Sequence, residues 1–128
     1  MFVTHETKEF LMSISHGSLE NTILNAIWYI EENNLVKEIT VSEVYELVKR
    51  TETPRAYTTI KTVMDRLVDK ELLVRTKQGK KFSYKTVNTR HETAHKAILK
   101  LANTYFNDDL VLLKEAVQGL CSSSKMFV

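Results

Sequence analysis

Apolar residues recur every three or four positions in the stretch that begins at Ser18. This spacing places them along one side of an α-helix, as expected for a helix that packs on a core. The pattern stops at the Asn33-Asn34 pair, where we expect the helix to end. The apolar stripe consists of Leu19, Ile23, Ile27 and Ile30, with Leu24 and Trp28 beside them.

A second helix is predicted to begin with a capping motif. Residues 40–43 have the Thr-x-x-Glu form, in which the side chains of Thr40 and Glu43 satisfy free backbone N–H groups at the helix start. Val44, Leu47 and Val48 then follow at the spacing of an inward-facing side. We expect a turn over residues 51–54, because a proline at position 54 disfavours helical conformation in the residue before it.

A third helix is predicted from Arg55 to Lys70, and its two sides differ in character. At 100° per residue, Val63, Met64 and Leu67 fall within about 60° of Ile60, which makes one side apolar. Polar and charged side chains occupy the opposite side: Arg55, Thr58, Lys61, Thr62, Asp65 and Arg66. A helix that packs on a core and presents its other side to DNA needs this asymmetry.

Two strand-like runs follow, over residues 72–77 and 80–86, and Gln78-Gly79 separates them. In the second run, Phe82, Tyr84 and Thr86 alternate with polar residues, so the pair is predicted to form a β-hairpin. Lysines gather near its tip, at Lys77, Lys80 and Lys81.

Two further helices are expected after Val87. The first begins with another Thr-x-x-Glu sequence at residues 89–92, and the second follows a break at residues 107–109 and ends at Gly119. The predicted organisation is a lead-in segment (1–17), a DNA-binding domain (18–87), a helical dimerisation region (88–120) and a flexible tail (121–128).

Composition excludes several classes of protein. The 128 residues are 43% hydrophobic, so one buried core is feasible, and no apolar run approaches the ~18 residues of a membrane helix. The first residues do not resemble a secretory signal, and Cys121 has no second cysteine with which to form a disulfide. We therefore predict a cytoplasmic protein without a membrane partner.

The charge is unevenly distributed along the chain. Between Lys49 and Arg90 there are 12 basic and four acidic residues, a net charge of +8, whereas the remainder has six basic and 12 acidic residues, a net charge of −6. A basic middle between acidic flanks is typical of a surface that binds a polyanion.

Three helices followed by a basic hairpin are the order of a winged helix-turn-helix domain, so the predicted fold class is mainly α with a small β-hairpin (α+β). In such domains the third helix enters the major groove and the hairpin, or wing, reaches the adjacent backbone. We expect the first half of the third helix to approach base edges, whereas Arg66 and Lys70 meet phosphates. The residues expected near bases are Arg55, Thr58, Thr59, Lys61 and Thr62.

Residues 55–70, with Leu72-Leu73 and the wing residues 79–84, resemble the recognition-helix and wing signature of the penicillinase-repressor (BlaI/MecI/CopY) family. Trp28 and the sequence at 41–44 continue the likeness, which extends over about residues 18–118. The resemblance implies a homodimeric repressor that occupies an operator dyad in double-stranded DNA. It implies DNA contacts by Thr58, Thr59, Lys61 and Thr62, with Arg55, Arg66, Lys80 and Lys81 toward phosphates. The C-terminal helices would form the dimer through Ile98, Leu101, Tyr105, Leu110, Leu113 and Val117.

Three positions depart from the family pattern. Glu71 stands where a glycine usually follows Lys70, so we expect a differently shaped turn there. Ala116-Val117 replaces the Asn-Phe pair at which some members are cleaved, and Cys121 alone cannot supply the cysteine cluster of copper-responsive members. The inducing signal, an effector or a protease, is left open. The chain also stops early, and an apolar N-terminal segment with Phe10, Leu11 and Ile14 is a candidate to compensate.

Two other functions are compatible with parts of the sequence. Residues 91–95 spell His-Glu-x-x-His, which on a helix can hold zinc between His91 and His95 with Glu92 as a general base. His5 and His16 are poor third ligands, and the chain leaves no second lobe for a substrate cleft, so we predict no enzyme and no cofactor, with the two histidines as a weak metal candidate. The second alternative is a winged helix that binds protein instead of DNA.

Overall fold

The structure is a computed structural model that describes residues 18–51 and 53–124. The chain divides into two compact units between Thr89 and Arg90, two residues beyond the expected domain boundary. The N-terminal candidates Phe10, Leu11 and Ile14 lie outside the described residues.

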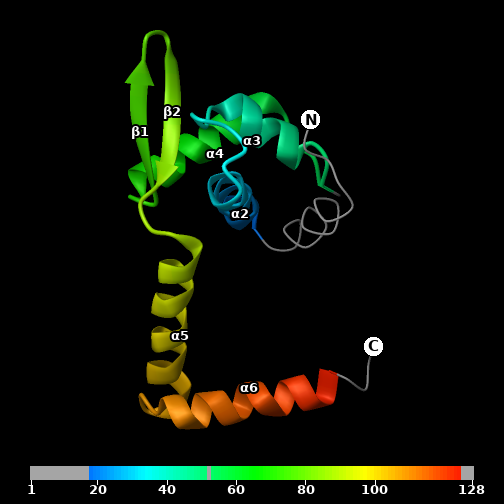
Figure 1. Cartoon of the computed structure of the whole chain (residues 1–128), viewed down its shortest axis with the longest axis vertical. Helices are drawn as coiled ribbons and strands as arrows, with labels where there is room; N and C mark the ends of the chain where they lie inside the picture. The colour runs from blue at the N-terminus through cyan, green and yellow to red at the C-terminus, as the bar shows by residue number, and fades with distance from the viewer. Residues whose placement is uncertain (1–17, 52, 125–128) are drawn as a thin grey trace. The chain divides into compact units, whose positions relative to one another are not determined.

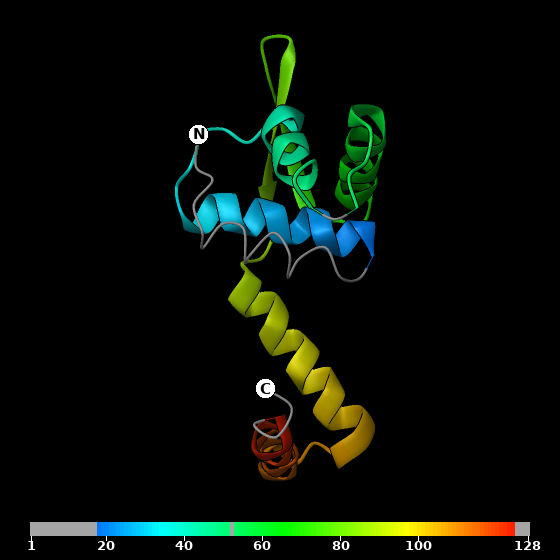
Figure 2. The same cartoon turned by 90° about the vertical axis from the view of Figure 1, so that its right-hand side faces the viewer.

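Within residues 18–51 and 53–89, the first unit contains three helices and one hairpin, in the predicted order. The helices are α2 (Leu19–Glu32), α3 (Val41–Val48) and α4 (Tyr57–Asp69), and the antiparallel strands are β1 (Leu73–Gln78) and β2 (Lys81–Thr86). Figures 1 and 2 show α2 lying across the bases of α3 and α4, with the hairpin beside them. The predicted winged-helix, α+β fold class is confirmed.

The first two helices begin at the residues that the local sequence predicts. The Ser18 hydroxyl accepts a hydrogen bond from the Asn21 backbone N–H at 3.2 Å, which caps α2. At the start of α3, the Glu43 carboxylate accepts a 2.8 Å hydrogen bond from the Thr40 N–H, as the Thr-x-x-Glu sequence predicts.

The apolar sides of the three helices meet in one core. Ile23, Val44, Ile60 and Leu67 are fully buried, and Tyr84 from β2 is buried with them. Burial of a large aliphatic side chain contributes about 1.5–3 kcal/mol, so this cluster is the main source of stability. An isolated β-bridge from Ile39 to Tyr84 attaches the α2–α3 connection to the hairpin.

The turn after α4 has the ordinary geometry of a helix end, contrary to the expectation raised by Glu71. Glu71 adopts φ 62°. Its backbone N–H donates a hydrogen bond to the Val68 carbonyl at 3.0 Å, and the Leu72 N–H donates one to the Leu67 carbonyl at 2.9 Å. This pair of bonds is a Schellman motif, which needs the left-handed conformation whether or not glycine is present. The two hydrogen bonds therefore hold a non-glycine residue in a strained conformation.

The hairpin turn lies one residue later than predicted. Gln78 pairs with Lys81, so β1 ends at Gln78 and the turn consists of Gly79 and Lys80. Gly79 has φ 63°, a conformation that glycine adopts without strain.

The second unit is a pair of helices, α5 (Arg90–Phe106) and α6 (Leu110–Ser124), joined by a corner at residues 107–109 (Figure 1). The Asp109 carboxylate accepts hydrogen bonds from the N–H groups of Val111 and Leu112 at 2.9 and 3.2 Å and so caps α6. The predicted end at Gly119 is wrong, because α6 continues through it and includes residues 121–124 of the expected tail. None of the helices in the described ranges is long and apolar enough to cross a membrane.

Candidate nucleic-acid interface

The outward side of α4 is open to solvent. Ile60, Val63, Met64 and Leu67 are buried, whereas Thr58, Thr59, Lys61, Thr62 and Arg66 are exposed, as the amphipathic pattern predicts. The Thr62 hydroxyl donates to the Thr58 carbonyl at 2.9 Å, which leaves its oxygen free to accept a hydrogen bond. The helix therefore presents short hydroxyl side chains and flexible cations on one accessible surface.

Arg55 does not belong to this helix, which corrects the predicted start. Ala56 is the extended N-cap residue and α4 begins at Tyr57. The Arg55 guanidinium donates to the carbonyls of Thr53 and Pro54 at 3.3 and 3.2 Å. The apolar periodicity begins only at Ile60, so it carries no information about the preceding turn. Arg55 is exposed in the loop that leads into α4.

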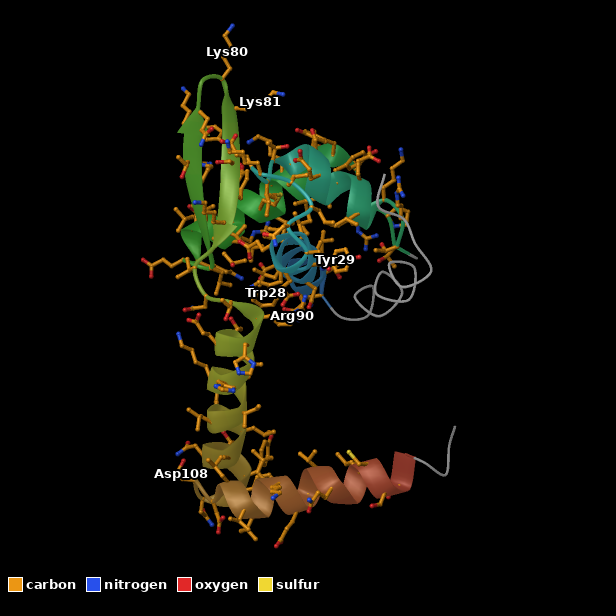
Figure 3. The ribbon with its side chains drawn as sticks, viewed as in Figure 1. Trp28, Tyr29, Lys80, Lys81, Arg90 and Asp108 are labelled. Atoms are coloured by element: carbon orange, nitrogen blue, oxygen red, sulfur yellow. The ribbon has the colours of Figure 1, made fainter. Side chains whose placement is uncertain are left out.

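The wing carries its lysines at the end away from the core. Lys77, Lys80 and Lys81 are exposed, and Figure 3 shows Lys80 at the tip of the hairpin with Lys81 beside it. Within residues 18–51 and 53–124, none of these three lysines forms a salt bridge. By contrast, the Lys70 ammonium lies 2.8 Å from a carboxylate oxygen of Glu20, so the structure places this expected phosphate ligand in an ion pair.

One carboxylate joins α4 to both strands of the wing. Asp65 Oδ2 lies 2.9 Å from the Lys61 ammonium, while Oδ1 accepts hydrogen bonds from Arg75 Nη1 and the Tyr84 hydroxyl, each at 2.9 Å. The Arg75 guanidinium also lies over the Phe82 ring, 4.5 Å from its centroid. Sequence reasoning placed Asp65 on the polar side of the helix but missed this role, because its partners are four, ten and 19 positions away.

The Asp65 network shifts the pKa values of its members. Burial alone acts to raise the pKa of Asp65, but hydrogen bonds from Lys61, Tyr84 and Arg75 outweigh burial and lower the pKa below 3.8. Burial, with the hydrogen bond to Asp65, raises the pKa of Tyr84 to about 12. The hydrogen bond to Asp65 also raises the pKa of Arg75. At neutral pH Asp65 is therefore a carboxylate, Arg75 a cation and Tyr84 a neutral phenol.

A small hollow of about 190 Å³ lies where the start of α3, α4 and the wing meet. Thr40 and Ser42 line it at the N-terminus of α3, together with Tyr57, Lys61 and Lys81. The N-terminus of a helix attracts anions because its first N–H groups are not used within the helix. Sequence analysis assigned Thr40 only a capping role, since the proximity of the lysines depends on the tertiary fold.

The two histidines of the His-Glu-x-x-His sequence lie on α5. His91 and His95 are exposed, and their ring centroids are 4.1 Å apart. No group of three or more potential metal ligands occurs in the part of the chain that the structure describes, and His5 and His16 lie outside that part. A catalytic zinc site uses three protein ligands, and the described residues bring two histidines together on α5.

The predicted dimer residues differ in accessibility. Five of the six are exposed, whereas the sixth, Leu113, is 7% exposed. Ala102, which is not one of the predicted residues, is 1% exposed. These two are the buried apolar residues of the second unit within the described range, so Leu113 packs inside the unit, and its place in a dimer interface stays a prediction. The exposed members are Ile98, Leu101, Tyr105, Leu110 and Val117.

Three helices, a hairpin with a basic tip and an accessible polar side of the third helix define a winged helix-turn-helix protein of the DNA-binding class. The family model described as penicillinase repressor matches residues 16–126. The chain therefore belongs to the penicillinase-repressor family, and the protein is a DNA-binding transcriptional repressor. This is a family of regulators, not of enzymes.

Solved structures include a similar regulator. One is the crystal structure of MepR, a transcription regulator of the Staphylococcus aureus multidrug efflux pump MepA. Its sequence is 13% identical to this one, and the match covers 93% of this chain and 90% of that chain with a TM-score of 0.44. No curated relative matches the chain.

Proposed function

We propose that the protein is a cytoplasmic homodimer that represses transcription by occupying an operator dyad. Thr58, Thr59, Lys61 and Thr62 read base edges in the major groove. A threonine hydroxyl can donate or accept a hydrogen bond and its methyl group can contact thymine, so an exposed threonine row suits this role. Arg55 and Arg66, at either end of this row, contact the flanking phosphates.

The wing and the start of α3 position the protein on the DNA backbone. The ammonium groups of Lys77, Lys80 and Lys81 are accessible, and neutralisation of phosphates by such groups releases counterions and provides much of the affinity. We place one phosphate at the hollow beside Ser42, where the α3 N-terminus and lysines of two other elements converge.

Dimerisation uses the apolar residues that remain exposed on α5 and α6. Leu101 and Tyr105 are 43% and 72% exposed, and large apolar side chains on the surface of two helices are typical of a subunit interface. Pairing of two chains sets the distance between their recognition helices, which a dyad operator requires.

The observation that carries the proposal is the accessible threonine-and-cation side of α4 next to the exposed lysines of the wing. The test is a salt titration of binding to a labelled duplex of random sequence. We expect affinity to fall steeply with salt, and the double variant Lys80→Ala/Lys81→Ala to reduce the slope by about 2 units.

A double variant on α5, Lys96→Ala/Lys100→Ala, is the matched control because it removes the same charge from exposed lysines outside the first unit. It should leave the slope unchanged. If binding is insensitive to salt, the winged helix binds a protein instead; if only the control changes the slope, the wing is not part of the interface.

A further inference from the structure

DNA binding leaves the two adjacent imidazoles of α5 without a role. His91 and His95 are four residues apart, both exposed, and their rings lie side by side, with centroids 4.1 Å apart and ring planes inclined at 52°. Side chains at this spacing project from one side of a helix, one turn apart.

This arrangement has the chemistry of a chelate. Imidazole nitrogen is a preferred ligand of zinc, nickel and copper, with metal–nitrogen bonds of about 2.0–2.1 Å for zinc. Because the rings already lie next to each other, rotation about their side-chain bonds is sufficient to direct one nitrogen of each toward a common ion. The backbone of α5 does not have to move.

We propose that His91 and His95 form a surface site for a divalent first-row transition-metal ion, with water completing the coordination. Two imidazole ligands select for late transition metals over magnesium and calcium, which prefer oxygen. The general order of stability places Cu²⁺ above Ni²⁺ and Zn²⁺ at such a site. The described chain offers no third protein ligand, so the site binds metal without forming the three-ligand centre of a zinc peptidase.

Metal binding would also act on the helix itself. An ion held by both rings links the first and second turns of α5, which begins at Arg90. A cation near a helix N-terminus is electrostatically unfavourable, and the carboxylate of Glu92 in the same turn offsets this effect. We therefore expect bound metal to slow amide hydrogen exchange in the first two turns of α5. This site does not depend on the proposed DNA contacts.

The test is calorimetric titration of the full-length protein with Cu²⁺, Ni²⁺ and Zn²⁺, together with NMR of the histidine ring protons. We expect the tightest binding for Cu²⁺, with selective broadening of the His91 and His95 signals by substoichiometric Cu²⁺. The variants His91→Gln and His95→Gln should each weaken Cu²⁺ binding at least tenfold and abolish the effect on exchange in α5.

Exchanging the residues at positions 95 and 96 provides the matched control. The double variant His95→Lys/Lys96→His keeps composition and charge but places the two imidazoles five residues apart, about 140° around the helix. It should lose binding as fully as His95→Gln, with the circular dichroism of the helices retained. His5 and His16 are present in every variant and contribute the same background. Equal Cu²⁺ affinity in the exchanged and native proteins, or broadening confined to other histidines, overturns the proposal.

Discussion

Asp65 of α4 and Arg75 of the wing are joined by a 2.9 Å ion pair between Oδ1 and Nη1. The same carboxylate oxygen accepts a 2.9 Å hydrogen bond from the hydroxyl of Tyr84, a core residue of the second wing strand. One side chain thus links α4, the helix that we propose faces DNA, to both strands of the hairpin. The relationship also places a negative charge beside Lys61, a proposed DNA contact.

Removal of that charge should alter the salt dependence of DNA binding. Asp65→Asn releases Lys61 and Arg75 from their ion pairs, so both cations become available to phosphates. We expect the slope of log affinity against log salt on random-sequence DNA to steepen by about 1–2 units. Discrimination between the operator and random DNA should fall, because the two ion pairs no longer fix the side chains of Lys61 and Arg75 between α4 and the wing.

Asp69→Asn is the control for this measurement, since Asp69 is an exposed residue of the same helix and its substitution changes the net charge equally. A general charge effect would steepen the slope equally in both variants. That result would show that the ion pairs of Asp65 do not restrain the two cations.

The lowered pKa of Asp65 should make stability depend on pH in the acid range. Although burial acts to raise this pKa, the hydrogen bonds from Lys61, Tyr84 and Arg75 hold it below the ordinary value of 3.8. The unfolded chain therefore binds the proton at a higher pH than the folded chain, and the carboxylate contributes its stability fully above the unfolded pKa. That contribution is lost as the pH falls through the folded pKa.

Urea unfolding of the native protein and Asp65→Asn at a series of pH values measures this effect. The difference in free energy of unfolding should be constant between about pH 7 and pH 5 and should shrink below about pH 4. A difference that stays constant in acid would mean that the folded and unfolded pKa values of Asp65 are equal.

The strained turn after α4 predicts a stabilising substitution. Glu71 has φ 62°, where a side chain costs about 1–2 kcal/mol, whereas glycine has no such cost but loses more entropy on folding. We expect Glu71→Gly to raise the free energy of unfolding by about 0.5–1 kcal/mol, measured by urea denaturation. Glu71→Ala tests the cause, because alanine retains a Cβ and should give no gain. Equal stabilisation by both variants would assign the effect to the removed charge.

The exposed apolar surface of the second unit predicts a dimer that one charge can disrupt. Leu101 is 43% exposed on α5, and burial of an unpaired carboxylate at an interface is costly. Leu101→Glu should shift the protein from dimer to monomer in sedimentation equilibrium and weaken operator binding at least tenfold. Thr104→Glu, also exposed on α5, places the same charge at a polar position and should leave the dimer intact. A dimer that tolerates Leu101→Glu would assign dimerisation to other residues.

Several elements could be predicted from the sequence because their signals are local. The apolar spacing from Ile60 to Leu67 identified both the helix and its accessible side, and the pair Thr40 and Glu43 marked the start of α3. Predicted ends were less accurate. A glycine in a helix interior is only about 1 kcal/mol less favourable than alanine, so Gly119 does not end α6.

The sequence by itself determined the order of the helices and hairpin, the position of the lysines on the wing and the apolar side of each core helix. These features depend on periodicity and on the preferences of neighbouring residues. The tertiary structure decided that Asp65 meets Arg75 and Tyr84, and that Ser42 faces the same hollow as Lys81. Such contacts join residues far apart in the chain, and a side chain acquires them only when packing of the core has set the distance between its helix and the wing.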